Sequence, residues 1–184
     1  MNRTTLQDQL LTEQQQRIQR VRQEHETWLQ QHISSVTHAV TLTFNKAPIR
    51  AYMNQFNQSL TMNSPEMLEQ YSEALKRFGR ALNRSLFGNA AQRHSKSILM
   101  VPVFEGLQKS KTPHIHIAVS VPDDRSADFE EKVAAAWTAA TPFAGYTDTR
   151  LTHDNLGWSG YITKQSVFTD RQSIVFDAVM LPKS

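Results

Sequence analysis

Residues 112–119 read Thr112-Pro113-His114-Ile115-His116-Ile117-Ala118-Val119. Polar and apolar side chains alternate here, and successive side chains of a β-strand point to opposite faces. The pattern predicts a strand over 114–121 that buries its isoleucine face and projects both imidazoles from the other face. Two imidazoles held two residues apart on a strand can chelate one divalent metal ion, and such sites usually take a carboxylate as a further ligand.

Two neighbouring segments also have the pattern of strands. Residues 97–105 are apolar and end in Glu105, which could supply that carboxylate. Pro102 lacks an N–H group, so we expect this strand to lie at a sheet edge or to carry a bulge. Residues 36–44 alternate, with Thr41 and Thr43 on the face opposite to the large apolar side chains.

The remaining segments complete an α+β pattern. Ser64 and Pro65 have the residue types of a helix N-cap and first turn, and apolar residues then recur at spacings of 3 and 4 up to Gly88. We expect loops over 45–63 and 88–96, a helix over 126–140 and a short helix over 158–168, with strands over 146–153 and 173–180. This order predicts a central antiparallel sheet with packed helices.

The first 35 residues differ from the rest of the chain. They are rich in Gln and contain neither Gly nor Pro. Apolar residues follow a partial heptad spacing at Leu11, Ile18, Val21 and Trp28. We therefore expect an N-terminal helix over 1–35 that packs on the body, self-associates or frays, followed by one domain over 36–184.

Composition excludes several classes of protein. The chain has 184 residues, 39% of them hydrophobic and 20% charged, and it has no Cys. Disulfide-stapled domains, cysteine-ligated zinc ribbons and thiol enzymes are therefore excluded. No apolar run approaches the roughly 18 residues of a membrane span, so we expect an intracellular protein without a membrane partner.

The charge is unevenly distributed along the chain. The net charge is +3, but residues 36–111 hold ten Lys or Arg against four Asp or Glu, a net charge of +6. Such a segment fits a face that binds a polyanion, and it fits a solvated helix surface equally well.

A second candidate site lies in residues 157–165, which read Gly157-Trp158-Ser159-Gly160-Tyr161-Ile162-Thr163-Lys164-Gln165. On a helix, Tyr161 and Lys164 share one face. The glycines beside them leave room for a backbone as large as that of a nucleic acid. The alternative is a core tyrosine next to a solvated lysine.

Taken in order, these motifs resemble those of the HUH endonuclease superfamily, in particular single-tyrosine rolling-circle replication initiators (Rep type). Residues 40–45 are similar to the first motif of that family, His114-Ile115-His116 to the second, and Tyr161-Ile162-Thr163-Lys164 to the third. The acidic metal ligand of the family corresponds to Glu105. The resemblance covers about residues 36–170 and implies the HUH (RRM-like) sheet.

The resemblance also implies an activity. His114, His116 and Glu105 would hold Mn²⁺ or Mg²⁺, and Tyr161 would attack a DNA phosphodiester, giving a 5′-phosphotyrosine and a free 3′ hydroxyl. Lys164 would lower the tyrosine pKa, bind the phosphate or protonate the leaving oxygen. We expect Thr41 and Thr43 to line the DNA face, and Lys109 and Lys111 to contact phosphates.

Such a protein would nick and rejoin single-stranded DNA at an origin, which can be a hairpin. It would thereby start rolling-circle replication of a plasmid, phage or related mobile element in the cytoplasm of a host cell. The chain has no phosphate-binding loop of the helicase type, so a separate helicase would be needed.

Two other functions fit the same residues. Two His and one Glu with an open position also form a catalytic zinc set, although the helical His-Glu-x-x-His motif is absent. A regulator that binds nucleic acid without cleaving it is the other alternative.

Overall fold

The computed structural model describes residues 34–56, 60–106, 113–152 and 174–182, together with scattered positions between 13 and 32. The chain divides into two compact units, Met1–Ser34 with Asp154–Ser173 and Ser35–His153 with Ile174–Ser184. Each unit is considered by itself. In the first, the described positions between 13 and 32 are helical.

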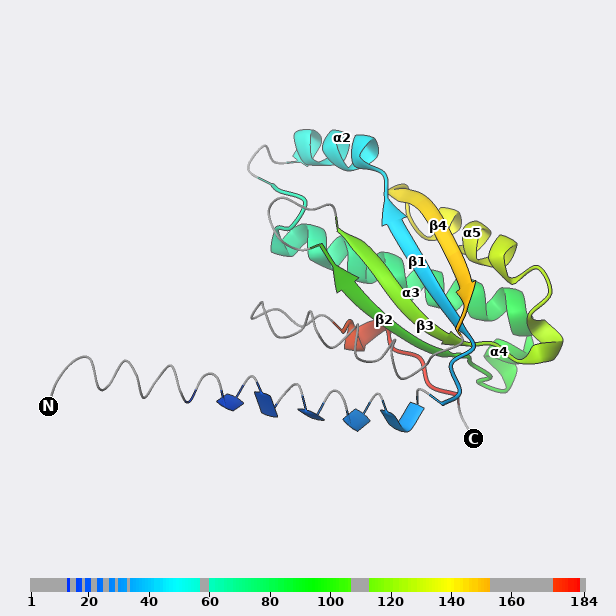
Figure 1. The fold of residues 1–184 in the computed structure, drawn as a ribbon. Helices are drawn as coiled ribbons and strands as arrows, with labels where there is room; N and C mark the ends of the chain where they lie inside the picture. The colour runs from blue at the N-terminus through cyan, green and yellow to red at the C-terminus, as the bar shows by residue number, and fades with distance from the viewer. Residues whose placement is uncertain are drawn as a thin grey trace, which may run out of the picture. The chain divides into compact units, whose positions relative to one another are not determined.

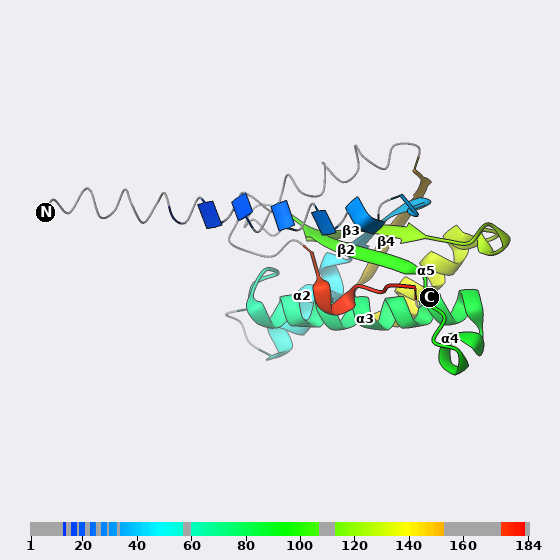
Figure 2. The same cartoon turned by 90° about the horizontal axis from the view of Figure 1, so that it is seen from below.

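The second unit contains a four-stranded antiparallel sheet in the order β2-β3-β1-β4 (Figure 1). The strands are β1 (His38–Phe44), β2 (Leu99–Glu105), β3 (His114–Ser120) and β4 (Ala144–Leu151). Helices α3 (Pro65–Phe87) and α5 (Phe129–Ala140) pack on one face, so that α3 runs along the sheet as a second layer (Figure 2). The expected α+β fold with an antiparallel sheet is confirmed.

Alternation along the strands decides which face is buried. In β1, every second residue from His38 to Phe44 is buried, and in β3 the buried face includes Ile115 and Ile117. The apolar side chains among them form a core with the apolar side of α3 and with Trp137 of α5. The threonines of β1 and the histidines of β3 therefore lie on the opposite face of the sheet, as expected.

Helix α3 begins and ends at the residues that the sequence indicates. The side chain of Ser64 accepts a hydrogen bond from the Met67 amide, Pro65 occupies the first turn, and Gly88 ends the helix at a φ of 56°. In the middle of the helix, a Cβ added at Gly79 would lie 2.8 Å from the Met180 sulfur. Glycine at this position allows α3 to approach the C-terminal segment closely.

The expected loop over 45–63 is wrong in part, because helix α2 (Lys46–Phe56) lies within it. The Asn45 side chain accepts a hydrogen bond from the Ala47 amide at the helix start. The signal was present in the sequence, since apolar residues recur at 49, 52, 53 and 56, the spacing of one helix face. A short helix, α4 (Ala90–Arg93), likewise lies in the second expected loop.

The expected strand over 173–180 is also wrong. Ile174 bridges Val103 and Met180 bridges Met100, and the 3-10 turn η2 (Phe176–Ala178) separates the two bridges. The amide and the carbonyl of Met100 both hydrogen-bond to the backbone of Met180. At Pro102 only the carbonyl takes part, and it accepts a hydrogen bond from the Val175 amide. Since Pro102 has no N–H to donate, the ladder along this edge is interrupted. Pro102 lies on edge strand β2, which is one of the two alternatives expected for it.

The other expected elements agree within a few residues. Helix α5 follows a 3-10 turn, η1 (Asp123–Arg125), and β4 starts two residues before the expected strand. The helix expected over 158–168 lies outside the described residues. Within the described part of the chain, no helix combines the length and apolar character needed to cross a membrane.

Candidate metal centre

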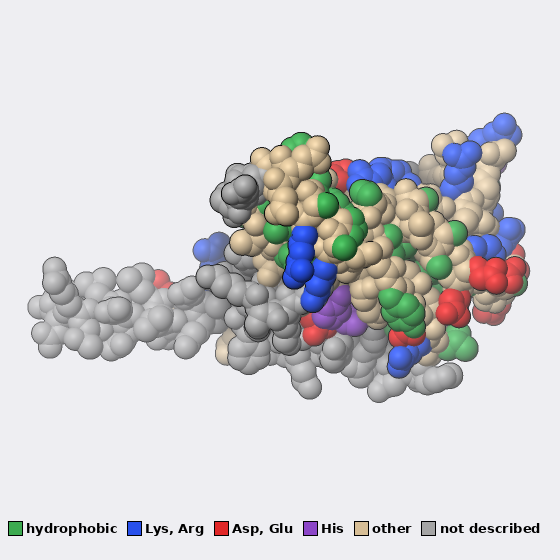
Figure 3. Space-filling model, turned by 90° about the horizontal axis from the view of Figure 1, so that it is seen from above, with side chains coloured by type: hydrophobic (Ala, Val, Ile, Leu, Met, Phe, Trp, Pro, Cys, Tyr) green, Lys and Arg blue, Asp and Glu red, His purple; other side chains and the backbone are tan. Residues whose placement is uncertain are grey.

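Three adjacent strands place the candidate ligands on one face of the sheet. Glu105 of β2 pairs with His114 of β3, and His116 of β3 pairs with Thr41 of β1. Residues paired across a sheet share a face, so these four side chains lie together on the face opposite to α3 and α5. Figure 3 shows histidine and acidic side chains side by side at the molecular surface, with Lys or Arg side chains next to them.

The distances within the group are those of a connected cluster. Glu105 Oε2 lies 2.8 Å from His116 Nε2 and 3.4 Å from His114 Nε2. The two imidazole rings are 5.0 Å apart between centroids and nearly perpendicular, at 87°. Both Nε2 atoms are therefore directed toward the same carboxylate oxygen.

This group could hold a metal ion. One ligand atom from each of Glu105, His114 and His116 lies within 4.8 Å of the other two. Two imidazoles and one carboxylate are a common ligand set for divalent transition metals, and they leave coordination positions open for water or substrate. Among the described residues, no other group of three such side chains meets this condition.

The environment favours the form of His116 that binds metals. Burial lowers the pKa of His116 below its ordinary value of 6.5, and His114 acts in the same direction, whereas Glu105 raises it. A neutral imidazole is the metal ligand. A lowered pKa means that protons compete less with a metal ion at neutral pH.

The two threonines expected on a DNA face have different partners. Thr41 Oγ1 lies 3.1 Å from His116 Nδ1, whereas the Thr43 hydroxyl donates to the Tyr146 carbonyl at 2.8 Å. Both lie on the same face as the histidines. Thr41 is thus hydrogen-bonded to one of the three candidate metal ligands, a contact that the sequence analysis did not predict.

Four of the predicted site residues lie outside the described residues. They are the two phosphate-contact lysines, Lys109 and Lys111, and the proposed nucleophile and its neighbour, Tyr161 and Lys164. Their roles stay predictions from sequence.

Tyr146 is a candidate that sequence reasoning missed. Its side chain is 70% exposed, and β4 shifts register against β1 between Leu42 and Phe44, so that Gly145 and Tyr146 lie opposite Thr43. A Cβ at Gly145 would lie 2.7 Å from Thr43 Oγ1. Gly145, directly before the expected strand over 146–153 and within β4, was the available signal, because glycine within a strand often marks a bulge.

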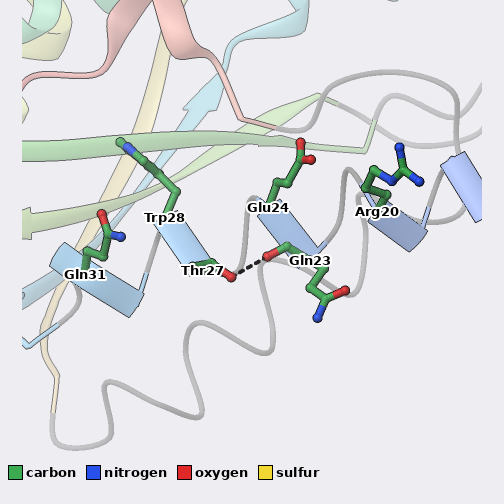
Figure 4. Close-up of a pocket in the computed structure, with 6 residues that line it drawn as sticks. All are labelled: Arg20, Gln23, Glu24, Thr27, Trp28 and Gln31. Carbon is green, nitrogen blue, oxygen red and sulfur yellow. Dashed lines mark hydrogen bonds between the residues drawn. The ribbon is translucent and has the colours of Figure 1, made fainter.

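A hollow on the N-terminal helix has different chemistry. Its lining residues recur at helical spacing along one segment: Arg20, Gln23, Glu24, Thr27, Trp28 and Gln31 (Figure 4). The Thr27 hydroxyl donates to the Gln23 carbonyl at 2.8 Å. Among the described residues that line it, the charged side chains are one Arg and one Glu, and they do not belong to a group of three metal-ligating side chains.

Comparison with known proteins does not identify a family. No protein-family model, curated protein or solved structure matches the chain.

Proposed function

We propose that this protein is a metal-dependent endonuclease of the HUH type, which nicks and rejoins single-stranded DNA. The observation that carries the proposal is the convergence of His114 Nε2 and His116 Nε2 on one oxygen of Glu105. The sequence motifs around Tyr161 and the basic character of residues 36–111 add support.

The metal requirement follows from the substrate. A phosphodiester is anionic, so a nucleophile approaches it against charge. A divalent cation bound by the three ligands supplies Lewis-acid polarisation of the scissile phosphate, an effect of several kcal/mol. Mn²⁺ and Mg²⁺ are the proposed ions, with Mn²⁺ bound more tightly, because imidazole is a better ligand for manganese than for magnesium.

Tyr161 is the proposed nucleophile. Its oxygen forms a bond to phosphorus while the bond from phosphorus to the 3′ oxygen breaks, and the phenol proton ends on that 3′ oxygen, directly or through Lys164. One phosphodiester replaces another, so the reverse step rejoins the ends. The free 3′ hydroxyl primes synthesis in rolling-circle replication of a plasmid, phage or related element, with a separate helicase unwinding the duplex in the cytoplasm of the host cell.

The experiment that tests this proposal looks for a covalent adduct. The full chain is incubated with Mn²⁺ and a pool of single-stranded oligonucleotides with random and hairpin segments, labelled at the 3′ end, and resolved on a denaturing gel. A 5′-phosphotyrosine carries the 3′-side fragment, so the label should migrate with the protein. Tyr161→Phe should bind DNA without forming the adduct, and Tyr146→Phe is the matched control that should form it.

Other results would select the alternative functions. Cleavage without an adduct, unchanged in Tyr161→Phe and strongest with Zn²⁺, would indicate hydrolysis by a His₂Glu zinc centre. Binding without cleavage under any divalent ion would indicate a regulator. Either result would overturn the proposal.

A further inference from the structure

One histidine of the metal group is held at both ring nitrogens. His116 Nε2 lies 2.8 Å from Glu105 Oε2, and its Nδ1 lies 3.1 Å from Thr41 Oγ1. Thr41 is the residue of β1 directly opposite His116 in the sheet register. The contact is therefore made by two rigid neighbouring strands and needs no loop.

The threonine that lies beside His114 has a different hydrogen-bond partner. Thr43 lies opposite His114 in the same register, but its hydroxyl donates to the Tyr146 carbonyl at 2.8 Å. Two threonines two residues apart on one strand thus face two histidines two residues apart on the next. Only the Thr41 hydroxyl, of these two, is bonded to a histidine ring.

Hydrogen-bond chemistry limits what each ring nitrogen can carry. A carboxylate oxygen only accepts, so Nε2 of His116 bears the hydrogen when it lies against Glu105. In a neutral imidazole the other nitrogen then accepts, and Thr41 donates to it. A metal ion bound at Nε2 requires the opposite arrangement, with the hydrogen on Nδ1 and Thr41 as its acceptor.

We propose that Thr41 is a positioning residue whose hydroxyl reverses from donor to acceptor when His116 binds a metal ion, so that the ring changes tautomer without moving. Water takes the proton from Nε2 and supplies one to Nδ1, so the charge of the ring is unchanged. This inference rests on the metal-binding part of the proposed function and does not depend on DNA cleavage.

A hydroxyl suits this position because it both donates and accepts. A backbone carbonyl or a carboxylate in its place would only accept, and would favour the metal-binding tautomer at all times. A valine has nearly the shape of threonine and does neither. Serine keeps the hydroxyl and loses only a methyl group.

The test is a titration of the full chain with Mn²⁺ alone, without DNA, in which free Mn²⁺ is followed by electron paramagnetic resonance. Outer partners of metal ligands contribute roughly 10–100-fold to affinity, so Thr41→Val should weaken Mn²⁺ binding by that factor. Thr41→Ser should restore most of it. Thr43→Val, the matched control on the same strand, should bind Mn²⁺ as the wild type does.

A second measurement needs no variant. Nitrogen NMR of the wild-type protein with labelled histidine, at pH 7.5, reports which ring nitrogen of His116 carries the hydrogen. We expect Nε2–H in the metal-free protein and Nδ1–H after addition of Mg²⁺, which is diamagnetic. The same tautomer in both states would overturn the proposed reversal.

The outcomes separate this inference from the proposed function. If the wild type binds Mn²⁺ and Thr41→Val binds it equally well, the inference fails while the proposed function stands. If the wild type binds no Mn²⁺ or Mg²⁺, both fail. If the threonine results are as expected but no DNA adduct forms, the inference stands and the proposed function fails.

Discussion

Glu105 lies closer to His116 than to His114, the residue it pairs with across the sheet. Its Oε2 is 2.8 Å from His116 Nε2 and 3.4 Å from His114 Nε2, although the β2–β3 register sets Glu105 opposite His114 and Val103 opposite His116. The side chain thus extends diagonally across the ladder. One carboxylate oxygen thereby serves both imidazoles, and this is what makes the three residues a single site.

Glu105→Gln is expected to weaken metal binding by more than the roughly 10–100-fold lost with an outer partner, because it removes a charged ligand. An amide keeps the size of the side chain but not its negative charge. Calorimetric titration with Mn²⁺ measures the change. Glu69→Gln, at an exposed position of α3, is the control. Wild-type affinity in Glu105→Gln would remove Glu105 from the ligand set.

Lys109→Ala combined with Lys111→Ala is expected to reduce the dependence of single-stranded DNA affinity on salt. Each lysine that neutralises a phosphate releases counterions, so removing two contacts should lower the slope of log K against log salt by about 1.4. Fluorescence anisotropy at several salt concentrations measures this slope. An unchanged slope would mean that the DNA phosphates contact other basic residues.

Tyr146→Ala is expected to weaken single-stranded DNA binding, because an exposed aromatic ring on the face of the metal group can stack on a base. Such stacking contributes about 1–3 kcal/mol per base, roughly 5–150-fold in affinity. Anisotropy with a short oligonucleotide measures the effect, and Tyr146→Phe should retain the binding. Equal affinities for Tyr146→Ala and the wild type would exclude a stacking role, provided that both unfold at the same temperature.

The free energy of unfolding is expected to fall as the pH drops below about 6.5, in part because of His38. Burial lowers the pKa of His38, whose ring packs on Phe129 at 4.7 Å between centroids. Between the lowered pKa and the unfolded value, the unfolded chain binds more protons, so acid favours unfolding. The loss continues until the pH passes the folded pKa. Burial also lowers the pKa of His116, so this residue contributes to the same loss of stability in acid.

Urea unfolding at pH 7.5 and pH 5.5 measures this effect. In His38→Leu the difference between the two pH values should be smaller than in the wild type, with the remaining difference due in part to His116. In this variant the Thr37 hydroxyl still accepts a hydrogen bond from the Val121 amide, so the residue directly before β1 stays bonded to the residue directly after β3. His94→Leu controls for removal of an exposed histidine. An identical pH difference in His38→Leu would contradict the assignment.

Local sequence patterns predicted much of the fold. Side-chain alternation predicted the faces of β1 and β3, and Ser64-Pro65 and Gly88 predicted the limits of α3. The missing N–H of Pro102 left an edge strand or a bulge, and the sheet order places β2 at the edge. Helix α2 was missed although its apolar spacing was visible, because the surrounding polar residues and Pro48 resemble a loop. The last expected strand was wrong because its continuity depends on a partner strand that contains Pro102.

The sequence by itself determined that two imidazoles project from one face of β3, because strand periodicity is a property of the local backbone. Only the tertiary structure decided which side chains meet them. The register of β2 brings Glu105 within reach of both rings, and the register of β1 sets the Thr41 hydroxyl against His116 and the Thr43 hydroxyl against the Tyr146 carbonyl. Register depends on contacts between segments distant in the chain, and a shift of one residue would turn each side chain to the other face.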